Sequence, residues 1–152
     1  MRAFAAAVWF LLCFPAHAAF ADAERFALLV GVDDYAPPMP KLEGARNDAT
    51  GLRDVLVSRW NFPRQHITLL LGADATHLGV INAMTSLMAQ TKPDDIVFVY
   101  FAAHGTSASN RGLRVPLPHT TGAILPADFR FGDAKEMLET LIIGRRDIRP
   151  AL

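Results

Sequence analysis

The chain has 152 residues, of which 15 are basic and 15 acidic, so its formal net charge is zero. This balance favours neither nucleic acid nor an anionic membrane surface as a partner. A single cysteine, Cys13, excludes an intrachain disulfide, and the length suits one modest domain rather than two.

The first residues have the pattern of a secretory signal. A basic residue precedes the apolar run Ala3–Phe14, and Ala16–Ala18 then offers small residues where signal peptidase needs them. The run is shorter than the ~20 residues that span a bilayer, which argues against an uncleaved anchor. We therefore expect residues 1–18 to be a signal peptide, with Ala19–Ala21 as a second possible site. The mature protein would be periplasmic or extracellular, without Cys13 and without stable membrane association.

Three short apolar runs predict buried strands, and two amphipathic segments predict helices between them. The first strand leads into a loop, because three prolines within residues 37–40 exclude a helix. Thr76 is the expected N-cap of the second helix. The alternating order predicts an α/β fold, a parallel sheet with helices on both faces. The strands are expected at 26–32, 66–71 and 96–103, and the helices at 45–60 and 77–90.

The rest of the chain gives weaker signals. From Thr106 to Gly122 the sequence is polar and rich in turn residues. A short strand with a turn is expected at 123–128 and a short helix at 134–139. The basic tail 144–152 predicts no element, and its arginines are expected to form a solvated face.

His104 follows the last apolar run directly, with Gly105 after it. Open parallel sheets bind their ligands at the carboxyl ends of the strands. An imidazole there can act as a general base for a nucleophile from a neighbouring strand. The alternative for His104 is a structural histidine that only packs at the strand end.

Four segments, in order from about residue 25 to 130, resemble the caspase superfamily on its metacaspase and bacterial caspase-like side. They resemble the opening strand, the start of the first helix, the catalytic histidine segment and the strand after the histidine loop. The resemblance implies a truncated caspase-like catalytic domain over residues 24–152, with an incomplete parallel sheet. The segments are RFALLVGVDDY at 25–35, LEGARNDA at 42–49, VYFAAHGT at 99–106 and AILPAD at 123–128.

This family is one of cysteine endopeptidases that act on polypeptides. The resemblance implies that His104 is the general base for a cysteine thiol and that the N–H of Gly105 helps to hold the oxyanion. Asp48 matches the aspartate that binds a basic residue before the scissile bond, which implies Arg/Lys preference. The alternative for Asp48 is an acidic residue that only favours the helix N-terminus.

The chain also departs from the family pattern. Ala103 replaces a glycine of the histidine segment, and Ala45 stands where many metacaspases have a cysteine. The loop 110–114 lacks the acidic cluster of calcium-dependent members, so we expect no metal ion and no cofactor. The other histidines after the predicted signal peptide, at 66, 77 and 119, have no metal-site spacing and are expected at the surface or at strand edges. Ser107 and Ser109 are poor candidates for a nucleophile.

The family's nucleophile lies in an Asp-x-Cys-His-x-Gly segment on the next strand, and this sequence does not contain it. We therefore expect an inactive fragment of a cysteine peptidase, with further domains or a partner chain beyond Leu152. The alternative is a non-catalytic binding or scaffold module with the caspase fold. In either case the edge of the strand at 96–103 lacks a partner, which predicts poor solubility or dependence on a partner.

Overall fold

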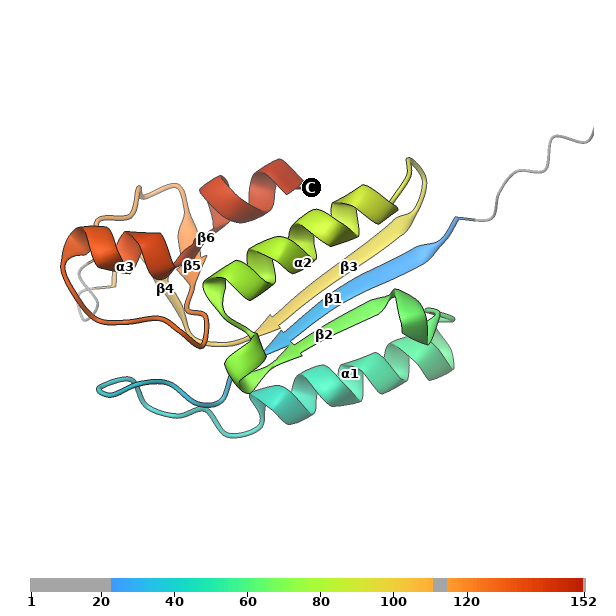
Figure 1. Cartoon of the computed structure of the whole chain (residues 1–152), viewed down its shortest axis with the longest axis horizontal. Coiled ribbons are helices and arrows are strands. Elements are labelled where there is room, and N and C mark those ends of the chain that lie inside the picture. The colour runs from blue at the N-terminus through green and yellow to red at the C-terminus, as the bar shows by residue number, and fades with distance from the viewer. Residues whose placement is uncertain (1–22, 111–114, 152) are drawn as a thin grey trace, which may run out of the picture.

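The computed structural model describes residues 23–110 and 115–151, so the predicted signal peptide lies outside the described residues. Its elements form a parallel sheet between two helices, followed by a small second sheet (Figure 1). They are β1 (Arg25–Gly31), α1 (Ala45–Arg59), β2 (Ile67–Leu71), α2 (His77–Gln90), β3 (Ile96–Ala102), β4 (Gly105–Ser107), β5 (Gly122–Ile124), α3 (Ala134–Thr140) and β6 (Ile142–Ile143).

The predicted parallel sheet is confirmed, with strand order β2-β1-β3. β1 is the central strand and pairs with both neighbours, Gly31 lying opposite Leu71 on one side and Ala102 on the other. Its residues from Phe26 to Gly31 are all buried. This central position explains why β1 is a continuous apolar run, since both of its faces are covered.

The two helices cover opposite faces of the sheet, as predicted (Figure 1). Ala27 and Leu29 of β1 point to the α1 side, where they belong to one cluster with Ala49 and Leu56. The alternate residues of β1 belong to the larger cluster on the α2 side. That cluster includes Phe26, Leu28, Val30, Val80, Met84 and Leu87.

Both helix starts have a local cause in the sequence. α1 follows Gly44, which has a φ of 104°, a backbone conformation that suits glycine. A residue 13 positions earlier caps its first turn, because the Asp33 carboxylate accepts a hydrogen bond from the N–H of Arg46 at 3.2 Å. At α2, the predicted cap is confirmed: the Thr76 side chain accepts from the N–H of Gly79 at 3.0 Å.

The second sheet was not predicted as a sheet. It is antiparallel, with strand order β4-β5-β6. β4 has three residues and β6 only two, too few to show the alternation by which a strand is read from sequence. The strand expected at 123–128 is shorter in the structure, because Pro126 and the turn around it end the pairing.

The basic tail also differs from the prediction. Residues Gly144–Ile148 form a π-helical turn and Arg149–Ala151 a 3-10 turn. Arg146 is not only a solvated residue, since its guanidinium donates to the carbonyl oxygens of Leu138 and Leu141 and pairs with Asp147. It thereby ties the end of α3 to the tail.

β3 has a pairing partner on one side only within the described part of the chain, namely β1. Its residues are half-buried or exposed, and Ile96 at its start is 45% exposed. The expected open edge is therefore present in this structure. In the described residues, we find no helix with the length and apolar character that a membrane span requires.

Candidate active site

The structure places His104 two residues after the end of β3, where the chain passes from the parallel sheet to β4. Its backbone is fixed on both sides. The N–H of His104 donates to the hydroxyl of Tyr35 at 3.0 Å, and its carbonyl oxygen accepts from the N–H of Leu125 at 2.9 Å. These bonds join the end of the large sheet to the small one.

The imidazole of His104 is held by a third contact. Its Nε2 lies 2.9 Å from the carbonyl oxygen of Pro40. A carbonyl oxygen only accepts, so this bond assigns the proton to Nε2 in the neutral ring. Nδ1 then carries the lone pair, and no residue described in the structure bonds to it. The histidine is therefore oriented as a base with Nδ1 free.

Tyr35 supports both the backbone and the ring of His104. Its hydroxyl accepts from the His104 N–H and donates to the carbonyl oxygen of Leu125 at 3.1 Å. The two rings lie 4.9 Å apart at 53°. Burial raises the pKa of Tyr35 to about 12, against an ordinary value of 10.0, so the hydroxyl stays protonated and able to donate at neutral pH.

The proline-rich loop after β1 supplies the carbonyl group that holds the imidazole. The N–H of Leu42 donates to the carbonyl oxygen of Asp33 at 2.9 Å, which closes the base of the loop. Lys41 pairs with Asp34 at 2.7 Å on its exposed side, a contact that lowers the pKa of Asp34. The loop is thus a support that brings Pro40 to His104.

Gly105 is exposed and begins β4, opposite Ile124. His104 and Leu125 lie opposite one another, and the N–H of Leu125 donates to the His104 carbonyl oxygen. They are therefore a hydrogen-bonded pair of the antiparallel ladder. Gly105 and Ile124 therefore occupy the next, non-bonded position, and the N–H of Gly105 points away from β5. That orientation leaves it available to an oxyanion.

Asp48 lies in the first turn of α1, and the start of α1 touches the end of β1. A methyl group placed on Gly31 would lie 2.6 Å from the carbonyl oxygen of Ala45. Gly31 pairs with Ala102, so β1 and β3 end side by side. Asp48 and His104 therefore both lie near the carboxyl ends of these strands. The Asp48 side chain is exposed, and none of the described residues forms an ion pair with it.

None of the remaining polar candidates bonds to the His104 side chain among the described residues. Ser107 ends β4 and shares a hydrogen bond of 3.0 Å with Ser109 in the turn that follows. His119 is exposed, and the backbone N–H of His77 donates to Asp128 at the start of α2. Within residues 23–110 and 115–151, no group of three His, Cys, Asp or Glu side chains could hold a metal ion. Residues 111–114 of the loop considered for calcium lie outside the described residues.

The model of the caspase domain family matches residues 24–144. The chain belongs to this family. The match covers the parallel sheet, both helices and the small sheet. It therefore confirms the predicted relationship and identifies the fold as caspase-like.

The caspase domain is also similar to curated metacaspases. It is 31% identical over 85 residues to metacaspase-6 of Arabidopsis thaliana, covering 53% of this chain and 23% of that protein. It is 28% identical over 114 residues to metacaspase-1 of Plasmodium falciparum, covering 70% and 18%. Metacaspase-1 of Schizosaccharomyces pombe is 25% identical over 88 residues. The matched part of the chain spans about a fifth of the length of these relatives.

Three residues that hold His104 are not among the predicted site residues. The sequence indicates Tyr35 only as part of the segment that includes the first strand, Pro40 only as a helix breaker and Leu125 only as a strand residue. Tyr35 carried a signal, since a polar aromatic after a buried apolar run needs a hydrogen-bond partner. Pro40 and Leu125 carried none, because both act through backbone carbonyl groups that every residue has.

Proposed function

We propose that this caspase domain serves a cysteine-type endopeptidase in which His104 is the general base. The observation that carries the proposal is the bond between Nε2 of His104 and the carbonyl oxygen of Pro40. It fixes the tautomer and directs Nδ1 away from the loop, as a base for a thiol must be held. The family relationship supports the same chemistry, and a polypeptide is the substrate class.

The reaction follows from these groups. Nδ1 of His104 takes the proton of the thiol, and the thiolate sulfur attacks the carbonyl carbon of the scissile peptide bond. The negative charge moves to the carbonyl oxygen, to which the N–H of Gly105 donates. The C–N bond then breaks, the leaving nitrogen takes the proton from His104, and a thioester remains. Water, deprotonated by His104, hydrolyses the thioester and releases the thiol.

The thiol is proposed to come from outside residues 23–151. The sequence has one cysteine, Cys13, in the segment proposed as a signal peptide. The open edge of β3 ends beside His104, so a further strand paired there would carry a side chain to the imidazole. The chain from residue 19 to 152 is accordingly proposed to have no turnover alone. A thiol-directed covalent inhibitor should label nothing in it, and labelling would contradict this.

Asp48 is proposed to bind a basic residue on the amino-terminal side of the scissile bond. Its exposed carboxylate lies near the carboxyl ends of β1 and β3, as His104 does. No described residue forms an ion pair with it. An arginine or lysine side chain would form a charge-assisted hydrogen bond there. The preference would be lost in Asp48→Asn, which keeps the shape of the side chain but removes its charge.

The test of the function uses the protein purified from its source cells, with any segment or partner that accompanies it. We expect hydrolysis of peptides with Arg or Lys before the cleaved bond, inhibition by iodoacetamide, and loss of activity in His104→Ala. His119→Ala is the matched control, because His119 is exposed and makes none of the contacts that hold His104. Peptide binding without any turnover would favour the non-catalytic scaffold module instead.

Export is proposed on the sequence pattern of residues 1–18. Amino-terminal sequencing of the protein from the periplasmic and extracellular fractions should find Ala19 or Asp22 first, for cleavage after Ala18 or Ala21. A chain that retains its first residues would contradict the proposal. Removal of the segment would also remove Cys13.

A further inference from the structure

One face of the small sheet is hollow because glycines occupy three of its positions. Residues directly opposite one another in an antiparallel sheet point to the same face. The register therefore sets Gly105, Ile124 and Ile142 in one row, and Ser107 and Gly122 in the next. Gly144 directly follows β6 beside this second row, with a Cβ position 3.4 Å from the carbonyl oxygen of Gly122.

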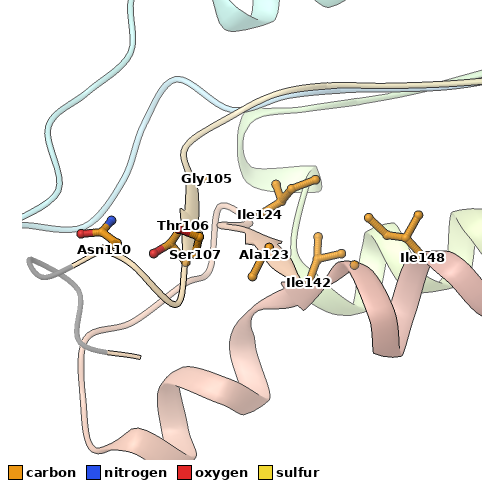
Figure 2. A pocket seen from close by; sticks show the side chains of 10 residues that line it. Gly105, Thr106, Ser107, Asn110, Ala123, Ile124, Ile142 and Ile148 are labelled. Carbon is orange, nitrogen blue, oxygen red and sulfur yellow. The ribbon is translucent and has the colours of Figure 1, made fainter. Parts of the chain in front are cut away.

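The hollow is a pocket of about 590 Å³ that opens to solvent, and these glycines and isoleucines line it together with Ile148. Its floor is backbone. The three isoleucines form an aliphatic wall, and the polar residues Thr106, Ser107 and Asn110 line the rest of the pocket. Figure 2 shows Ile124, Ile142 and Ile148 gathered on one side of the small sheet, next to Gly105. A volume of this size is in the range of binding pockets and suits one or two aliphatic side chains.

The start of α1, which carries Asp48, and the small sheet, which carries the pocket, lie on different sides of β3 (Figure 1). α1 starts at the end of β1, which is the neighbour of β3 on one side. The small sheet continues from the end of β3 on the other side (Figure 1). A polypeptide that places a basic residue at Asp48 and its scissile carbonyl at Gly105 must therefore leave toward the pocket.

The edge of β4 can guide that departing segment. By the alternation of the ladder, the carbonyl group of Gly105 and the N–H of Ser107 point away from β5. Neither makes a hydrogen bond to a described residue. An extended peptide backbone can pair with such an edge, while its alternate side chains enter pockets beside it.

We propose that this pocket binds the carboxyl-terminal, leaving-group side of the polypeptide substrate and selects an aliphatic side chain there. The inference rests on the proposed peptidase function and adds a second specificity determinant to it. The apolar walls disfavour a charged side chain, because its desolvation would not be compensated by any charged group in the lining.

The test follows binding of product-like peptides to the full chain labelled with ¹⁵N. Glycine amides are resolved from most others, so Gly105, Gly122 and Gly144 report from inside the pocket. The probe is the amide of Leu-Gly-Ala-Gly with a free amino terminus, and its counterpart has Asp in place of Leu. We expect saturable shifts at the three glycines with the Leu peptide and at least tenfold weaker binding of the Asp peptide.

Two variants probe the pocket. Ile148→Asp places a carboxylate in its wall and should weaken binding of the Leu peptide at least tenfold. Gly105→Ala fills its floor, and the new methyl group would lie 3.6 Å from the nearest atom, an ordinary contact that the fold tolerates. It should weaken binding even if Ile148→Asp disturbs the tail. Leu78→Asp is the matched control, because Leu78 is an exposed aliphatic residue on α2 outside the pocket lining.

A separate peptide keeps the two proposals distinguishable. Acetyl-Gly-Gly-Arg should shift the amides of Asn47 and Ala49 in the native chain but not in Asp48→Asn. If it does so while the Leu peptide leaves the three glycines unmoved, the pocket inference is overturned and the basic-residue preference stands. Equal affinity for the Leu and Asp peptides would also overturn the inference. Binding of the Leu peptide alone would sustain it and count against the role of Asp48.

Discussion

The hydroxyl of Tyr35 bridges the two sheets through the residue before β4, since it accepts from the N–H of His104 at 3.0 Å and donates to the carbonyl oxygen of Leu125 at 3.1 Å. Tyr35 is 8% exposed, so water does not easily replace either bond. Tyr35, in the loop after β1, therefore fixes the backbone of the candidate base that follows β3.

Tyr35→Phe should destabilise the protein by about 1–3 kcal/mol, because it leaves a buried N–H and a buried carbonyl oxygen without their partner. Urea denaturation followed by circular dichroism measures the change. Tyr100→Phe is the control, since Tyr100 is the other tyrosine of the chain and none of the described residues bonds to its hydroxyl. Equal losses in both variants would show that the bridge contributes nothing.

The same tyrosine predicts a loss of stability at alkaline pH. Burial raises its pKa to about 12 in the folded protein, against about 10 in an unfolded chain. Between these values the folded state holds a proton that the unfolded state has released, so stability falls as the pH rises from about 10 to 12. Melting temperatures should fall less steeply over this range in Tyr35→Phe. Parallel curves for the two proteins would contradict the assignment.

Two glycines should respond to alanine in opposite directions. Gly31→Ala brings a methyl group within 2.6 Å of the Ala45 carbonyl oxygen, so α1 must shift, at a cost of about 1–3 kcal/mol. Gly51 lies in α1 with open space around its Cβ position, and Gly51→Ala should stabilise the helix by about 0.5–1 kcal/mol. Thermal unfolding of both variants tests the pair. A stable Gly31→Ala protein would mean that α1 does not pack closely on β1.

Asp128 connects the segment after β5 to the start of α2. Its carboxylate accepts from the backbone N–H of His77 at 2.7 Å, beside the Thr76 cap of α2. Asp128→Ala should therefore cost about 0.5–2 kcal/mol, as the loss of a helix cap does. Glu43→Ala is the control, because Glu43 is exposed and no ion pair with a described residue involves it. An unchanged denaturation midpoint for Asp128→Ala would exclude this role.

The parallel core was predictable because each of its elements carries its own signal. The continuous apolar run predicts β1, and Thr76 predicts the start of α2, each from neighbouring residues alone. The small sheet was not predictable in this way, because β6 has two residues and pairs only through the register that β5 imposes. The contact of Pro40 with His104 was hidden for a similar reason, since it joins a backbone carbonyl to a side chain 64 residues away.

The open edge of β3 predicts self-association of the chain from residue 19 to 152. β3 has the apolar sequence of a central strand, yet only β1 pairs with it among the described residues, and unpaired apolar edges recruit other chains. Ile96→Lys adds a charge at the exposed start of this edge and should shift the protein toward monomer. Size-exclusion chromatography with light scattering measures this.

Leu78→Lys is the control, because Leu78 is 65% exposed but lies on α2. A wild-type chain that is monomeric at high concentration would contradict the prediction, whereas an oligomer that only Ile96→Lys disperses would locate the contact at β3.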